Sequence, residues 1–193
     1  MMSIGQWNLL RFAETLLPLI DPDESQAIRV AMEILEAYPL QFERYWLTGM
    51  RKKLGLQAAQ DGDSDLVQDL LNWMHRTRAD FTNTFRGLSS TEATEADRHQ
   101  DTAFMEWHAR WRQRRNSEGR ANADDVMRSA NPVVIPRNHR VEEALATAEG
   151  RDDFTLVHRL VEVLRSPFAE RPDTRDYADP PADERGYRTF CGT

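Results

Sequence analysis

The chain has 193 residues, of which 30% are charged and 40% hydrophobic, with 9 Gly and 9 Pro. This length allows one domain, or one domain with an extension, and a sizeable core. The composition excludes a disordered, collagen-like or disulfide-rich chain. The formal net charge of −7 argues against a generally basic nucleic-acid-binding protein.

The apolar stretches and the single cysteine indicate a cytoplasmic protein. The longest purely apolar stretches are a few residues long, far below the roughly 20 residues needed to cross a bilayer. Residues 1–7 lack the basic and apolar regions of a secretory signal. Cys191 is the only cysteine, so it has no partner for an internal disulfide. We expect a cytoplasmic location and no membrane partner.

Apolar residues recur at helical spacing along most of the chain, and Pro, Gly and Asp mark the expected helix ends. Asp23 is a candidate N-cap, and Pro39 is placed to open a new helix at its first turn. Asp63 or Asp65 is a candidate cap for the following helix. The sequence predicts helices over about 6–17, after 23, 39–55, after 63, 81–87, 104–119, around 126–127, 141–148 and 154–164.

The rest of the chain predicts loops and extended segments. Residues 89–100 are rich in Ser, Thr, Glu and Asp, which is typical of an exposed loop. Prolines flank residues 133–135, so this stretch must be extended. No stretch alternates like a half-buried strand. We therefore predict an all-α fold, with a helical segment over residues 1–165 and an irregular, Pro-rich tail over residues 166–193.

Local motifs for catalysis, cofactors and metals are missing from the sequence. The Asp61-Gly62-Asp63 stretch begins like a calcium-binding EF-hand loop, but Leu66 and Asn72 stand where that loop needs glycine and an acid. The five histidines form no zinc-binding pair, and no nucleophile elbow or phosphate-binding loop occurs. We predict no catalytic, cofactor-binding or metal-binding residue in this chain.

One basic cluster runs from Arg110 to Arg115, with Trp111 inside it. Arginines with an interleaved tryptophan can bind a phosphate backbone and stack a base. However, Trp107 and Trp111 share a helix face with Phe104, which favours a core position for both tryptophans. Single-stranded nucleic-acid binding through this cluster therefore ranks last among the functional hypotheses.

The segment from Asn131 to His139 is the most unusual local sequence. A proline-braced extended segment that ends in Arg137-Asn138-His139 must be held in place by neighbouring groups. Asn138 is a candidate cap for the next helix, and Arg137 and His139 can bond to carbonyls or carboxylates of neighbouring helices. A structural brace is favoured over a ligand site.

Several ordered motifs resemble the selenoprotein O family, also known as the YdiU-type family. The resemblance covers residues 4–193 and matches the C-terminal part of that family. The motifs are Trp7-Asn8-Leu9 with Arg11 and Ala13, Met50-Arg51-Lys52-Lys53-Leu54-Gly55-Leu56, Asp80-Phe81-Thr82-Asn83-Thr84-Phe85-Arg86, Asn131-Pro132 through Ile135-Pro136-Arg137-Asn138-His139, Val141-Glu142, and Tyr187-Arg188-Thr189-Phe190-Cys191.

The resemblance implies a kinase-like fold whose members transfer AMP from ATP to hydroxyl side chains of other proteins. It implies ATP and Mg (or Mn) as cofactors of the full-length proteins, and protein substrates as their partners. The family's nucleotide-clamping, metal-binding and candidate base residues all precede the motif at Trp7. None of them is carried over, so the partner implied for this chain is the upstream kinase-like half.

Cys191 matches a family cysteine or selenocysteine near the C-terminus that is proposed to form a redox latch. Its presumed partner is absent here, and a plain terminal cysteine is an equal alternative. The leading hypothesis is a C-terminal segment of a protein adenylyltransferase that is inactive alone. The alternative is a free-standing helical interaction module.

Overall fold

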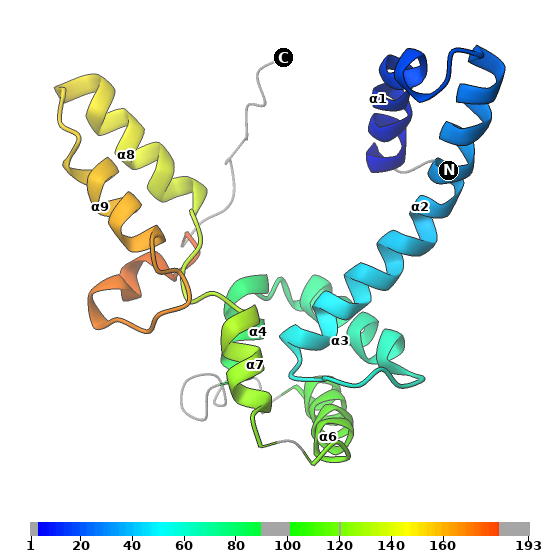
Figure 1. Cartoon of the computed structure of the whole chain (residues 1–193). Helices are drawn as coiled ribbons and strands as arrows, with labels where there is room; N and C mark the ends of the chain where they lie inside the picture. The colour runs from blue at the N-terminus through cyan, green and yellow to red at the C-terminus, as the bar shows by residue number, and fades with distance from the viewer. Residues whose placement is uncertain (1–3, 90–100, 120, 182–193) are drawn as a thin grey trace. The chain divides into compact units, whose positions relative to one another are not determined.

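The computed structural model describes residues 4–89, 101–119 and 121–181. The chain divides into two compact units, residues 1–50 and residues 51–193. Within the described ranges every regular element is a helix and no strand occurs, which confirms the predicted all-α class (Figure 1).

The first unit contains helix α1 (Ile4–Ile20) and most of helix α2 (Glu24–Lys53). Asp23 caps α2 as predicted, because its Oδ1 accepts the backbone N–H of Ser25 at 2.9 Å. α1 extends past the end predicted near Pro18, which lies inside its last turn. Only two helical residues follow this proline, so little of the helix is left for it to disturb.

The predicted helix start at Pro39 is wrong, because α2 continues through this residue. A proline inside a helix has no N–H for the carbonyl four residues earlier, which here is the carbonyl of Leu35. The side-chain Nε2 of Gln6, on α1, donates to that carbonyl at 3.4 Å. The neighbouring helix therefore supplies the donor that Pro39 lacks, and the helix persists.

The second unit begins at Arg51 and holds the remaining helices. Glycines in the left-handed region follow the end of α2 and precede the start of α3, namely Gly55 at φ 72° and Gly62 at φ 87°. The helices pair as α3 with α6 and as α8 with α9. The elements after α2 are α3 (Asp63–Thr77), α4 (Phe81–Gly87), α6 (Thr102–Asn116), α7 (Ala123–Ala130), α8 (Asn138–Arg151), α9 (Thr155–Leu164) and the 3-10 helix η1 (Pro172–Tyr177).

Aromatic side chains of α3 and α6 form the core of this second unit. Trp107 and Trp111 stack nearly parallel with ring centroids 5.9 Å apart, and both are 2% exposed. Their indole N–H groups donate to the carbonyls of Leu66 and Leu54, at 2.8 Å and 2.9 Å. A buried indole N–H without an acceptor would cost stability, so these bonds make the deep burial favourable.

The tail is more ordered than the sequence predicted, because η1 lies within it. Asp173 in η1 accepts from Arg159 of α9 at 2.8 Å and from Arg171 at 2.7 Å. These two arginines lower the pKa of Asp173 to about 2. Residues 166–181 belong to the same unit as residues 51–165, and a domain boundary after residue 165 stays a prediction.

Candidate functional site: a junction of three motifs

Three of the sequence motifs that are far apart in the chain meet in the second unit. We call their meeting point the motif junction and define it by Lys53, Asp80, Arg86, Asn131 and Arg137. These residues come from the end of α2, the N-cap and body of α4, and the extended segment before α8. Contacts across 41 to 95 positions of sequence hold it together.

Arg137 forms the central contact of the motif junction. Its guanidinium donates to both carboxylate oxygens of Asp80, at 2.6 Å and 2.9 Å, and to the carbonyl of Ala178 at 2.7 Å. Asp80 also caps α4 by accepting the backbone N–H of Asn83 at 2.8 Å. A planar guanidinium matches a carboxylate in this two-bond geometry, so Arg137 ties the extended segment to α4 and to the tail.

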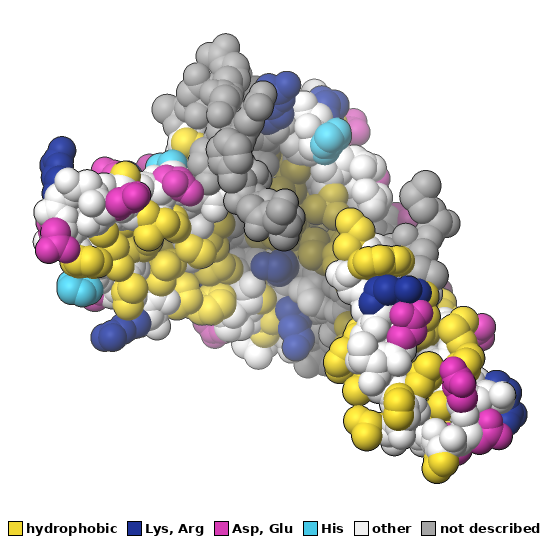
Figure 2. Space-filling view, turned by 90° about the horizontal axis from the view of Figure 1, so that it is seen from above, with side chains coloured by type: hydrophobic (Ala, Val, Ile, Leu, Met, Phe, Trp, Pro, Cys, Tyr) yellow, Lys and Arg dark blue, Asp and Glu magenta, His cyan; other side chains and the backbone are white. Residues whose placement is uncertain are grey.

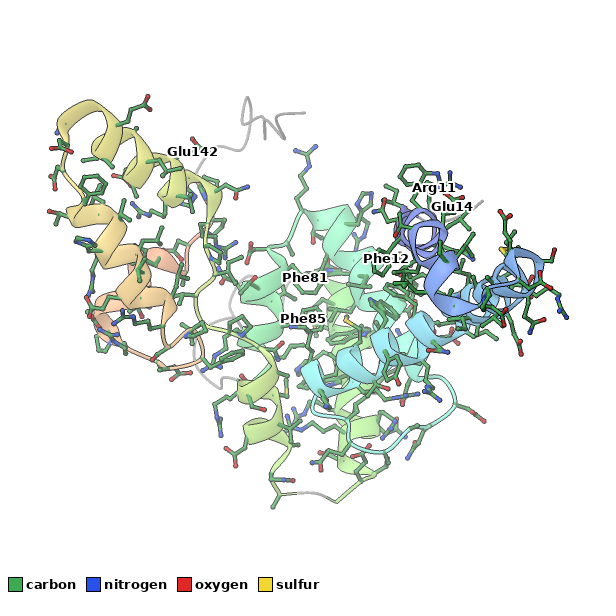
Figure 3. The ribbon with its side chains drawn as sticks, turned by 45° about the horizontal axis from the view of Figure 1, so that its top comes forward. Arg11, Phe12, Glu14, Phe81, Phe85 and Glu142 are labelled. Carbon is green, nitrogen blue, oxygen red and sulfur yellow. The ribbon has the colours of Figure 1, made fainter. Side chains whose placement is uncertain are left out.

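Lys53 and Asn131 join the end of α2 to the end of α7. The Lys53 Nζ donates to the Ala130 carbonyl at 3.0 Å and to the Asn131 Oδ1 at 3.3 Å. The Asn131 Nδ2 donates back to the Lys53 carbonyl at 2.9 Å. The ammonium also lies 5.6 Å and 5.7 Å from the ring centroids of Phe81 and Phe85, which are labelled in Figure 3.

Arg86 connects α4 to α7 and to the tail. Its Nη1 donates to the carbonyls of Arg128 and Asn131 at 3.1 Å and 2.9 Å, and its Nη2 donates to Glu170 at 2.6 Å. Glu170 is 70% exposed at its side chain, so this ion pair is worth little by itself. The two carbonyl bonds, which are nearer the interior, are the contacts that position α4.

The charged groups of the motif junction bond within the chain: Arg137 pairs with Asp80, Arg86 pairs with Glu170, and Lys53 donates to neutral oxygens. Burial by itself raises the pKa of Asp80, but the bonds from Arg137 and from the Asn83 backbone outweigh it, and the pKa is lowered. Burial lowers the pKa of Lys53. The guanidinium of Arg137 donates hydrogen bonds to Asp80 and to the tail. These contacts fit a structural brace, the role that the sequence favoured for this segment.

A second ion network, which the sequence did not predict, surrounds Asp63. Its side chain is fully buried and accepts from Arg51 at 2.6 Å and from Arg114 at 2.7 Å. The predicted role of Asp63 as a helix cap is wrong, because Gly62 occupies the N-cap position. The carboxylate instead accepts the backbone N–H of Gln60 at 3.0 Å. These three donors outweigh burial, which alone raises the pKa of Asp63, and lower it.

Glu118 extends this network to the loop after α2. Its two carboxylate oxygens accept the backbone N–H groups of Gln57 and Ala58, at 3.0 Å and 3.1 Å. It also accepts from Arg114 at 2.8 Å, one helical turn earlier in the chain. The spacing of Arg114 and Glu118 was visible in the sequence, whereas their contacts to Asp63 and to this loop were not.

The other predicted motif residues are not among the five that define the motif junction. Trp7 and Asn8 are exposed on α1 in the first unit, and Pro136 is exposed in the extended segment. The predicted capping by Asn138 is wrong, because Arg137 occupies the N-cap position and no side chain caps α8. Burial and the neighbouring arginines lower the pKa of His139. Cys191 lies outside the described residues.

Three of the four arginines of the cluster on α6 form ion pairs, and the fourth, Arg112, is exposed. Arg110 pairs with Asp69 at 2.8 Å, Arg114 with Asp63, and Arg115 with Asp124 at 2.7 Å. Trp111 is buried, as the sequence favoured, and has no free face on which a base could stack. The geometry that would support nucleic-acid binding is therefore not formed at this cluster.

The described ranges hold neither a metal-binding cluster nor a membrane-spanning helix. No group of three or more His, Cys, Asp or Glu side chains in residues 4–89, 101–119 and 121–181 is arranged to hold a metal ion. Over the same residues no helix is both long and apolar enough to cross a membrane.

Comparisons with known proteins identify the family. The sequence model of the family described as "Protein adenylyltransferase SelO" matches residues 2–165. Curated relatives called "Protein nucleotidyltransferase YdiU" are 49% identical in Geobacillus kaustophilus, 48% in Halalkalibacterium halodurans and 45% in Alcanivorax borkumensis. The matches cover 98%, 98% and 99% of this chain but 40%, 39% and 40% of the relatives.

The chain thus spans about two fifths of the length of these curated relatives. The matched residues include α1 and α2 and every element of the motif junction. The chain belongs to the protein adenylyltransferase SelO family.

Proposed function

We propose that this chain is the helical C-terminal segment of a protein adenylyltransferase that transfers AMP from ATP to Ser, Thr or Tyr hydroxyls of other proteins. Family membership is the observation that carries this proposal. The full-length protein would use ATP with Mg (or Mn) and would act on protein substrates in the cytoplasm.

In this proposal the chain supplies a scaffold and its upstream kinase-like half supplies the chemistry. The polar groups of the motif junction are paired with one another, as Arg137 is with Asp80. A residue that must bind nucleotide or move a proton needs a group that is available to the substrate. The described polar clusters instead hold helices together, which supports an architectural role.

The alternative, a free-standing interaction module, predicts that each helix buries a face within the chain. In the second unit, α6 meets this condition through Trp107 and Trp111. In contrast, α1 has no buried residue, and Trp7 and Phe12 are 53% and 59% exposed. An exposed apolar patch at these two residues is the feature that favours the segment hypothesis.

Transfer of label from ATP tests the proposal. The purified 193-residue chain and the full-length Geobacillus kaustophilus relative are each incubated with α-labelled ATP, Mg or Mn, and a mixture of acceptor proteins. We expect AMP on protein only in the reactions with the full-length relative. Label transfer by the 193-residue chain would contradict the scaffold role, and no transfer by the relative would contradict the activity.

A further inference from the structure

The first unit exposes several large apolar side chains. The side chains of Ile4 and Leu19 on α1 are 82% and 83% exposed, and Leu40 on α2 is 75% exposed. Figure 2 shows hydrophobic side chains, in yellow, spread over the surface of this helix pair at the right of the view. We call the exposed apolar side of α1 the α1 face and define it by Ile4, Trp7, Phe12 and Leu19.

Ten of the 17 residues of α1 are apolar, and large apolar side chains stand between the polar ones on its exposed side, a pattern typical of a helix that is enclosed on more than one side. Its only charged residues, Arg11 and Glu14, pair with each other at 2.6 Å, and the guanidinium of Arg11 lies 5.9 Å from the Trp7 ring centroid. Figure 3 labels both beside Phe12. The ten apolar residues of its 17 are Ile4, Trp7, Leu9, Leu10, Phe12, Ala13, Leu16, Leu17, Leu19 and Ile20.

The contact between α1 and α2 uses only part of this apolar surface. Gly5 lies against Tyr38, whose hydroxyl oxygen is 2.6 Å from the position that a Cβ would take, and Gln6 bonds to the Leu35 carbonyl. The buried residues in this part of α2 recur every four residues, so they share one helix face. They are Ala27, Ala31 and Leu35. Among the described residues of the first unit, no element covers the α1 face.

Two observations indicate what covers the α1 face. The family match begins at residue 2 and includes all of α1, so this helix belongs to the shared domain of the family. About three fifths of the length of each relative has no counterpart in this chain. A shared helix with large exposed apolar side chains fits a role as a contact surface for the part of the family-length protein that this chain does not contain.

We propose that the α1 face is the surface on which the remaining part of the family-length protein packs, with α1 held between that part and α2. This proposal rests on the proposed function, because it takes the chain as a segment of the full-length enzyme. The exposed parts of four large apolar side chains would leave water on assembly, which is the driving force expected for this packing.

Hydrogen exchange of backbone amides tests the proposal with two proteins that can be purified as they are. The exchange of α1 is compared between this 193-residue chain and the full-length Geobacillus kaustophilus relative. We expect the α1 amides to exchange at least about tenfold more slowly in the relative, because burial suppresses local opening. The amides of α3 and α6 serve as the internal control and should differ much less.

The same substitution in both proteins gives a matched second measurement. Phe12→Asp should leave the melting temperature of this chain within about 1 °C, because Phe12 is 59% exposed here. Aspartate at the aligned position of the relative should lower its melting temperature by several degrees. Equal small shifts in both proteins would overturn the proposal.

Other occupants of the α1 face give different results. Protection of α1 in this chain that rises with protein concentration would assign the face to a second copy. Protection that is already high and independent of concentration would assign it to the chain itself. Either result overturns the proposal. A relative that protects α1 but transfers no AMP would contradict the proposed function alone.

Discussion

The two units of the chain solve the problem of burying apolar side chains differently. In the second unit, Trp107 and Trp111 are 2% exposed and each indole N–H has a backbone acceptor. In the first unit, Trp7 on α1 is 53% exposed. Tryptophan is therefore enclosed in one unit and half-exposed in the other, so the presence of large apolar residues does not by itself show that a segment buries them.

The largest difference between the units should come from replacing a tryptophan in each. Trp107→Ala removes a stacked, buried ring and should lower the free energy of unfolding by about 3–5 kcal/mol. Trp7→Ala removes a half-exposed ring and should change it by less than about 1 kcal/mol. Urea unfolding followed by circular dichroism measures both, and equal losses would break the contrast.

Disrupting the Asp63 network should give the second-largest loss in the free energy of unfolding. Asp63→Asn leaves Arg51 and Arg114 beside a neutral side chain in the interior, which should cost about 2–4 kcal/mol. Asp61→Asn, at an exposed position two residues earlier, is the matched control and should stay within about 0.5 kcal/mol. The same urea titration measures both. A cost below 1 kcal/mol for Asp63→Asn would show that the network does not stabilise the unit.

The Arg137 contact should show a smaller effect that depends on geometry. Arg137→Lys keeps the charge but loses the two-bond contact with Asp80, and we expect a loss of about 1–2 kcal/mol. Arg112→Lys, on the exposed surface of α6, should be neutral. Thermal unfolding of the two variants in parallel is the measurement. An unchanged melting temperature for Arg137→Lys would show that the two-bond contact with Asp80 does not stabilise the unit.

The smallest effect should be a loss of stability in acid. The pKa values of Asp63 and Asp80 are lowered below the usual 3.8 in the folded chain. The unfolded chain therefore binds more protons, and the stabilisation present above about pH 4 is lost as the pH falls through the folded pKa values. Urea midpoints at pH 5 and pH 3 should differ, and less so in the Asp63→Asn variant. Equal differences in both proteins would contradict this account.

Much of the fold could be predicted from the spacing of apolar residues. The pattern at Phe104, Trp107 and Trp111 predicted α6 and its buried face, and Gly87 marked the end of α4. Helix spacing depends on neighbours in sequence, so it can be read from the chain directly. The break predicted at Pro39 failed because the compensating donor, Gln6, lies 29 residues away from Leu35.

The motif junction could be predicted in part. The sequence marked Arg137 as a residue that bonds to neighbouring helices, and its motifs supplied Lys53, Asp80 and Asn131. Their partners could not be assigned, since Arg137 and Asp80 are 57 positions apart and many carboxylates were available. The bond from Arg137 to the Ala178 carbonyl could not be predicted at all, because every residue has a backbone carbonyl and the sequence does not show which one accepts.

The contrast between the units is tested most directly by hydrogen exchange of this chain alone, with α1 and α6 followed in the same experiment. The account predicts that α6 amides exchange only through global unfolding, whereas α1 amides exchange at least about tenfold faster through local opening. Equal protection of the two helices would contradict it, since α1 would then be covered within the chain itself.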